Sequence, residues 1–146
     1  MPVYDRFVPS RKEKRAGGYL IPARLKQVVE LLERQGISVE SITGRLRTRA
    51  EVFNVATLVV DSLFEGHHPV RAEGQWLPQQ VDTTVAAGWY LVSTDQPLGT
   101  LAAYLLEPAS EDGVVTWNFL DQELHAGSAY PILRVEETAI PSALAP

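Results

Sequence analysis

Apolar residues in the first part of the chain recur with two different spacings. Four of them follow the helical spacing i, i+3, i+4, i+7: Leu25, Val28, Val29 and Leu32. Gly36 supplies a stop, so the pattern predicts a helix over 23–35. The flanking segments 19–21 and 37–42 are apolar or alternating, which is typical of strands. A strand, a helix and a strand with tight connections indicate a small βαβ unit with a right-handed crossover.

From Ala50 onward the sequence acquires the features of an antiparallel sheet. Segment 50–63 is rich in β-branched residues, which predicts a strand with room for a β-bulge. Turn signals separate further short strands, which are expected at 70–76, 80–85, 89–93 and 130–135. The short turns between successive strands predict a meander of mainly antiparallel type.

A second helix is predicted over 97–106, with Asp95 as its N-cap and Pro97 in its first turn. Its buried stripe is expected to contain Leu98, Leu101, Ala102 and Leu105. A short third helix is expected at 118–124. The fold class that follows is α+β: a mainly antiparallel sheet with two or three helices.

Length and composition favour a single globular domain. The chain has 146 residues and 45% hydrophobic content, enough for one core. We expect a linker-like lead-in at 1–17, the domain at 18–138 and a frayed tail at 139–146. No apolar run approaches the roughly 20 residues that cross a bilayer, so we expect no membrane partner. Asp5 and Arg6 stand where a signal peptide needs apolar residues.

Charge is distributed unevenly around a net charge of −5. Residues 1–49 hold eleven Lys and Arg and five acids, a net of +6. Residues 50–146 hold two basic residues and thirteen acids, a net of −11. Such segments usually form solvated faces that attract each other in the fold. The basic run 11–15 is short, contains an acid and lacks neighbouring stacking aromatics, so we expect no nucleic-acid binding.

Histidines are the first residues to consider as metal ligands, because the chain has no cysteine and therefore no thiolate zinc site. His67 and His68 are adjacent in an expected turn, where histidines are usually solvated. His125 follows Asp121 by four residues on one expected helix face, which allows a metal pair or a histidine–carboxylate pair. His67 and His125 are weak metal candidates, because neither pattern contains a third ligand.

Carboxylates and aromatics gather between positions 107 and 121. Glu107, Glu111 and Asp112 could form an acid/base pair, although carboxylates at helix ends and turns ordinarily serve as caps. Trp117 and Phe119 follow closely, and too many large apolar groups lie here for a plain solvent-exposed turn. This conflict supports the hypothesis that 107–121 is a contact surface with an acidic rim.

Two other interpretations of the aromatic residues stay open. Large aromatics dominate protein cores, so core packing is their ordinary role. Alternatively, Trp76 and Trp89 on neighbouring predicted strands would form a platform for a sugar.

A series of short motifs carries a family resemblance. They are 2–9 (Pro-Val-Tyr-Asp-Arg-Phe-Val-Pro), 18–22, 28–37, 66–67, 96–99, 105–108, 112–113, 117–119, Asp121, 130–132 and 134–135. In order and spacing they resemble the C-terminal accessory region of a bacterial zinc carboxypeptidase of the carboxypeptidase A-like family. The likeness spans nearly the whole chain.

The resemblance brings no catalytic residue to this chain. A zinc carboxypeptidase needs a His-x-x-Glu pair and a third histidine, whereas no glutamate stands three positions after any of the three histidines. The resemblance therefore implies a non-catalytic accessory domain that docks on a peptidase domain of the same parent chain. Zinc is then expected only in that missing domain, and none in this chain. It also implies a secreted or periplasmic parent.

Other functions and partners stay open at this point. The main alternative is an independent carbohydrate- or peptide-binding module. A small hydrolase that uses Glu107 and Asp112 is a third reading of the same carboxylates. Homo-oligomer formation is a further option for this chain.

Overall fold

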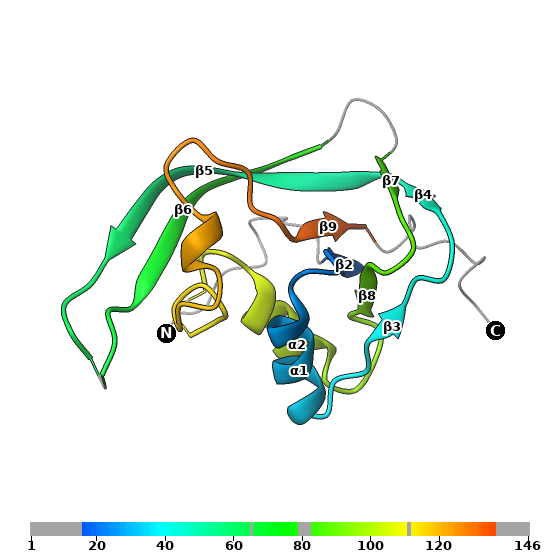
Figure 1. Ribbon diagram of the computed structural model, residues 1–146, viewed down its shortest axis with the longest axis horizontal. Helices are drawn as coiled ribbons and strands as arrows, with labels where there is room; N and C mark the ends of the chain where they lie inside the picture. Colours follow the sequence, from blue (N-terminus) through cyan, green and yellow to red (C-terminus); the bar gives the residue numbers. More distant parts are fainter. Residues whose placement is uncertain (1–15, 65, 79–82, 111, 137–146) are drawn as a thin grey trace, which may run out of the picture.

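A six-stranded sheet forms the centre of the protein (Figure 1). The computed structural model describes residues 16–64, 66–78, 83–110 and 112–136. In spatial order the strands are β3 (Glu40–Ser41), β8 (Tyr90–Ser93), β2 (Gly18–Ile21), β9 (Leu133–Val135), β5 (Ala50–Val60) and β6 (Val70–Pro78). Every pair of neighbours among the described strands is antiparallel. The predicted α+β fold with a mainly antiparallel sheet is confirmed.

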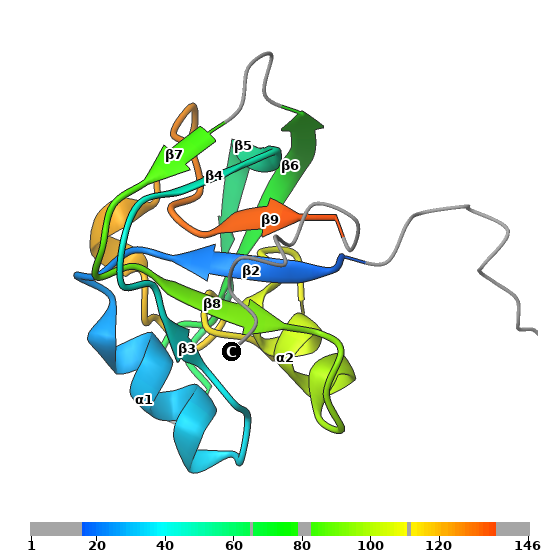
Figure 2. The same cartoon turned by 90° about the vertical axis from the view of Figure 1, so that its right-hand side faces the viewer.

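The central strand β2 supplies side chains to a core on each face of the sheet. Tyr19 and Ile21 pack with helices α1 (Lys26–Arg34) and α2 (Gly99–Leu106), whereas Leu20 packs with a smaller cluster. The smaller cluster includes residues of a two-stranded sheet, β4 (Leu46–Thr48) with β7 (Thr83–Val85). Figures 1 and 2 show the helices on one side of β2 and the small sheet on the other. Successive residues of a strand point to opposite faces, which explains this division.

Helix α1 has the predicted buried face but begins three residues later than expected. Val28, Val29 and Leu32 are buried. The residues before it form a turn in which the Leu25 N–H donates to the Pro22 carbonyl, so the helix starts at Lys26. The chain leaves the helix through Gly36, whose φ of 90° is costly for residues other than glycine.

The predicted βαβ unit is present in a split form. Strands β2 and β3 are both antiparallel to β8, which lies between them, so they run parallel without pairing. The predicted strand 37–42 is reduced to Glu40–Ser41. Ile37 is buried in the core beside helices α1 and α2 instead of pairing in the sheet.

Helix α2 begins at Gly99, two residues after the predicted start, and Asp95 does not cap it. Gly99 is required here, because an added Cβ would lie 1.8 Å from the Thr94 carbonyl oxygen. Its buried residues are Gly99, Ala102 and Leu106. The predicted stripe is therefore rotated: Leu98 is exposed, and Leu101 and Leu105 are only partly buried.

Strands β5 and β6 form a long bent hairpin that extends away from the rest of the sheet (Figure 1). The register shifts between Val55 and Thr57, so the predicted β-bulge is confirmed. Beyond this hairpin the predicted meander is wrong. Strand β7 pairs with β4 and β8 pairs with β2, so β6, β7 and β8 are not neighbours. Of the predicted strand 80–85, residues 80–82 lie outside the described part.

After α2 the chain follows the outer edge of β6. The Ala72 N–H donates to the Pro108 carbonyl and the Val70 N–H to that of Thr116, both at 3.4 Å. The predicted helix at 118–124 is replaced by turns and one 3-10 turn, η2 (Asp121–Glu123). We call residues 107–119, without residue 111, the edge segment. It connects the two sites described below.

The predicted boundaries at 17 and 138 stay predictions. Most of the lead-in 1–17, the basic run 11–15 and the tail 139–146 lie outside the described residues. Within the described ranges, neither helix has the length and apolar character needed to cross a membrane.

Candidate functional site

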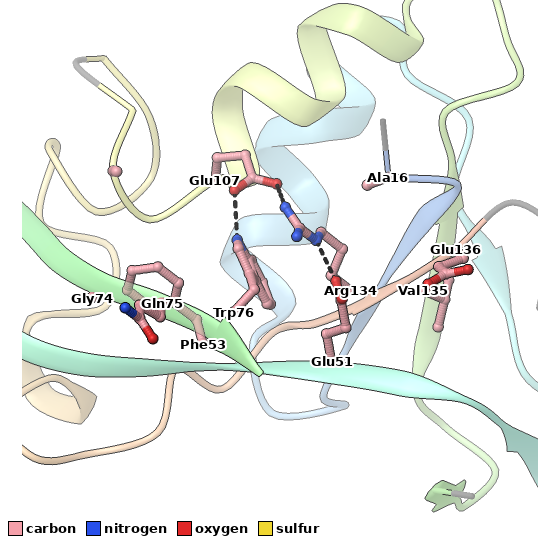
Figure 3. Close-up of a pocket in the computed structure, with 11 residues that line it drawn as sticks. Ala16, Glu51, Phe53, Gly74, Gln75, Trp76, Glu107, Arg134, Val135 and Glu136 are labelled. Carbon is pink, nitrogen blue, oxygen red and sulfur yellow. Dashed lines mark hydrogen bonds and ion pairs between the residues drawn. The ribbon is translucent and has the colours of Figure 1, made fainter. Parts of the chain in front are cut away.

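A cavity of about 670 Å³ lies beside the base of the long hairpin (Figure 3). Its walls come from strands β5, β6 and β9 and from the turn that follows α2. The polar and aromatic residues that line it are Glu51, Phe53, Gln75, Trp76, Glu107, Arg134 and Glu136. Figure 3 shows Glu51, Trp76, Glu107 and Arg134 pointing toward one another. We call these four residues, together with Tyr19, the Glu107 network.

Glu107 is the centre of this network. It is the C-cap residue of α2, where the backbone turns to an extended conformation and directs the side chain across the sheet. The Tyr19 hydroxyl donates to its Oε2 at 2.5 Å, and the Trp76 indole N–H donates to its Oε1 at 2.9 Å. Arg134 Nη1 donates to Oε2 at 3.3 Å. Three donors from three strands therefore hold one carboxylate in a fixed orientation.

Arg134 is held between two carboxylates. It stands opposite Glu51 in the β9–β5 register, and its Nε donates to Glu51 Oε1 at 2.8 Å. Its guanidinium carbon lies 4.4 Å from the centre of the Trp76 ring, in a cation–π contact. Burial opposes the charge of Arg134, but hydrogen bonds and attraction from Glu51 and Glu107 outweigh it and raise the pKa.

An aromatic cluster packs against the Glu107 network through Trp76, which belongs to both. Phe53, Trp76 and Tyr130 make edge-to-face contacts with ring centres 5.4 to 6.2 Å apart. The Tyr130 hydroxyl donates to the Leu106 carbonyl at 2.6 Å. Burial, and next the charge of Glu107, raise the pKa of both Tyr19 and Tyr130. Both phenols therefore keep their protons and serve as structural donors.

A second polar–aromatic cluster lies at the far end of β6, where the hairpin turns. The Trp117 indole N–H donates to Asp112 Oδ1. The Trp117 ring stacks on His67, with ring centres 4.2 Å apart and planes at 26°. The backbones of Phe64 and His67 bond to each other and close the turn.

Asn118 joins this cluster to the hairpin. Its Oδ1 lies 2.5 Å from His67 Nδ1, so Nδ1 carries the proton, because an amide oxygen only accepts. Its Nδ2 donates to the His68 carbonyl at 3.0 Å and to Asp121 Oδ1 at 3.2 Å. Asn118 has a φ of 71°, in the left-handed region. Within the described residues, His67 Nε2 is buried and has no hydrogen-bond partner.

Apolar side chains around this cluster are exposed. The exposed fractions are 63% for Val60, 66% for Leu63, 53% for Phe64 and 40% for Trp117. We call these four residues the hairpin-tip surface. A groove of about 490 Å³ lies beside them, with mostly apolar walls that include Leu58, Val70 and Leu124.

The structure distributes the predicted contact surface 107–121 over three places. Glu107 lines the cavity, Asp112 and Trp117 lie at the hairpin tip, and Phe119 packs partly buried against the main core. Trp76 and Val70, which mark the two ends, are six strand residues or about 20 Å apart. Glu111 lies outside the described residues. The interface role of these five residues stays a prediction.

The two weak metal candidates lie in different surroundings. His67 is held by Asn118 and Trp117, as described above. His125 is exposed and follows the 3-10 turn, so it does not share a helix face with Asp121. In the part of the chain that the structure describes, no three His, Cys, Asp or Glu side chains are grouped as metal ligands.

The cavity network contains residues that sequence reasoning missed. Arg134 carried a usable signal: it is one of two basic residues in a stretch with thirteen acids. Tyr19 and Glu51 carried none, because nothing in the sequence places them near Glu107. The suggested sugar platform does not form, since Trp76 packs against the main core and Trp89 against the smaller cluster.

Comparison with known proteins identifies two similar sequences. The chain is 30% identical to Carboxypeptidase 2 of Trichophyton tonsurans over 130 residues, and 28% identical to Carboxypeptidase 2 of Trichophyton equinum over the same length. Each match covers 88% of this chain but only 23% of the relative. The chain therefore corresponds to less than a quarter of the length of the curated relatives it matches. No family model and no solved structure matches the chain.

Proposed function

We propose that this chain is a non-catalytic accessory domain that packs on the peptidase portion of a carboxypeptidase. One observation carries the proposal: the similarity covers 88% of the chain yet occupies 23% of each carboxypeptidase. Most of this chain matches one part of each relative, and the rest of the relative is much longer. These are the proportions of one domain in a larger protein. Zinc and catalysis would then belong to the remainder.

Two finer features rest on the resemblance in the sequence rather than on these relatives. We propose that the domain follows the peptidase portion along the parent chain, and that the parent is bacterial and secreted or periplasmic. The two relatives come from Trichophyton species, so their origin does not bear on the bacterial branch. A reading frame that continues upstream into a His-x-x-Glu domain would support the accessory role.

The accessory role is tested with Carboxypeptidase 2 of T. tonsurans from which the matched 130 residues are deleted, called here the truncated peptidase. If the truncated peptidase is active, titration with this chain should give saturable binding. If it is inactive, addition of this chain should restore peptidase activity. The absence of both binding and restored activity would contradict the proposal.

Metal content gives an independent test of where zinc resides. After dialysis against buffer without metal, the purified chain should contain far less than one zinc ion per molecule. Stoichiometric zinc that disappears in His67→Ala or His125→Ala would overturn the assignment of zinc to the peptidase portion.

A second function is favoured by the cavity alone. Its volume of about 670 Å³ lies in the range of small-ligand sites, and its polar groups are held in place before any ligand arrives. We keep a carbohydrate- or peptide-binding module as the alternative on this basis. Calorimetric titration with oligosaccharides and short peptides tests it: saturable binding that Gln75→Ala abolishes would favour the module, and no heat from any ligand would reject it.

A further inference from the structure

The four exposed apolar side chains of the hairpin-tip surface lie beside a hydrogen-bonded turn and the stacked rings of His67 and Trp117. Val60, Leu63 and Phe64 lie on the turn side of the long hairpin, and Trp117 comes from the edge segment beside it. Exposed apolar residues on a turn would ordinarily be free to fold back against the protein. Here the backbones of Phe64 and His67 bond to each other in both directions, and the side chains of Leu63 and Phe64 are exposed.

Trp117 is fixed in the same way. Its indole N–H is bound to Asp112 and one face of the ring is stacked on His67, while the side chain stays 40% exposed. An aromatic ring that is already held loses little conformational freedom when a partner covers it. Trp is also enriched among the residues that dominate binding energy at interfaces.

Two unfavourable features occur at this one place. Asn118 adopts a left-handed backbone conformation, and His67 Nε2 is buried without a hydrogen-bond partner among the described residues. Both features cost stability, and residues held in this way by their surroundings cluster at functional sites. Hydrogen bonds from Asn118 to His68 and Asp121 hold the arrangement. The shape of the hairpin tip is therefore maintained at a cost in folding free energy.

We propose that the hairpin-tip surface is the face by which this domain docks on the peptidase portion of a carboxypeptidase. This inference rests on the proposed function, which supplies the occupant: more than three quarters of each relative lies outside the matched region. The charged residues around the tip fit an interface with a polar rim. Asp112 accepts from the Trp117 indole, Asp121 accepts from Asn118, and Asp61 lies 3.9 Å from Arg71. The occupant is therefore an apolar patch of the peptidase portion with basic or polar groups at its margin.

The chain offers a matched control on the same hairpin. Leu77 is 45% exposed and lies near the opposite end of β6 from Leu63. Replacing either leucine with serine removes the same apolar side chain from a solvent-exposed position. The test variant is Leu63→Ser, and the control is Leu77→Ser.

Binding of wild type, test variant and control to the truncated peptidase is measured by titration calorimetry, with restored activity as the readout if that partner is inactive alone. We expect the control to match wild type, and the test variant to bind at least about tenfold more weakly. Urea unfolding of each variant verifies that the domain itself is intact, since exposed side chains contribute little to folding.

The outcomes separate this inference from the proposed function. If the test variant binds as tightly as wild type, the domain docks by another face, so the inference fails and the proposed function stands. If wild type neither binds nor restores activity, both fail. If sedimentation instead shows wild-type dimers that the test variant cannot form, the occupant is a second copy of this chain, which also overturns the inference.

Discussion

A tryptophan bonded to a carboxylate lies near each end of strand β6, and the two pairs differ in their surroundings. At one end the Trp76 indole N–H bonds to Glu107, and at the other the Trp117 indole N–H bonds to Asp112. Trp76 is surrounded by Arg134, Phe53 and Tyr130, whereas a single ring contact covers one face of Trp117. The pair of an indole and a carboxylate is therefore enclosed by other side chains at one end of β6, where it stabilises the fold. At the other end the indole stays partly exposed.

The two clusters differ in how many of their polar groups have hydrogen-bond partners and in how much of their apolar surface is buried. In the Glu107 network, three donors meet one carboxylate and two carboxylates meet one guanidinium. At the hairpin tip, the buried His67 Nε2 has no hydrogen-bond partner among the described residues, and four apolar side chains face solvent. A closed network stabilises its own domain, while an incomplete one is a place where a second surface can bind.

Substitution of the two tryptophans separates these roles most strongly. Trp76→Ala removes the centre of an aromatic cluster and one donor to Glu107, so we expect a loss of about 3–5 kcal/mol of unfolding free energy. Chemical denaturation followed by circular dichroism measures it. A loss below about 1 kcal/mol would show that Trp76 is not structural and would make the cavity a stronger ligand site.

The carboxylate of Glu107 is expected to matter somewhat less. Glu107→Gln keeps the size of the side chain but removes the charge that pairs with Arg134 and turns one acceptor into a donor. We expect a loss of about 2 kcal/mol, reduced from the fully buried case because the pair is partly solvated. Glu73→Gln is the matched control: its contact with Arg71 at 3.7 Å is exposed, so its change should be within about 0.5 kcal/mol.

Alkaline pH should weaken the fold through Tyr19 of the Glu107 network and Tyr130 of the aromatic cluster that packs against it. The pKa values of Tyr19 and Tyr130 are raised in the fold, so the folded protein holds their protons after the unfolded chain releases them. This stability is complete below about pH 10, the ordinary pKa of tyrosine, and is lost as pH rises above it.

For each of the two groups the slope is about half of 1.4 kcal/mol per pH unit at about pH 10 and approaches the full value above about pH 11. Urea unfolding at several pH values between about 9 and 12 measures it. Tyr19→Phe removes one group and should reduce the slope by about half. An unchanged slope in that variant would mean that Tyr19 ionises freely in the folded protein.

The smallest effect on stability is expected at the hairpin tip. Trp117→Ala removes a partly exposed ring whose contacts are the Asp112 carboxylate and the face of His67, so we expect a loss of about 1 kcal/mol. Denaturation beside Trp76→Ala measures the contrast directly. A loss of about 3–5 kcal/mol would identify Trp117 as core and would leave no docking role for it.

The parts of the fold that the sequence predicted have local causes. The face of helix α1 follows from the spacing of Val28, Val29 and Leu32, and strand β5 follows from its β-branched run. The pairing of β7 with β4 was not predictable, because non-local contacts decide it. Helix α2 begins at Gly99 because residues 96–99 form a turn in which the Gly99 N–H donates to the Gln96 carbonyl.

The candidate site was predictable only in part. The sequence placed Glu107 and Trp117 in one segment, and both contribute to clusters. It could not show that the segment follows the edge of β6 and carries these residues to opposite ends. Glu51 and Arg134 meet only because β9 inserts between β2 and β5, a pairing of segments 83 residues apart.

The dissociation constant of Trp117→Ala for the truncated peptidase tests the central claim most directly. This claim is that the Glu107 network serves the fold while the hairpin tip serves docking. The account predicts binding weakened about thirtyfold, the equivalent of about 2 kcal/mol, in a domain that unfolds almost as wild type does. Unchanged binding by Trp117→Ala would contradict it.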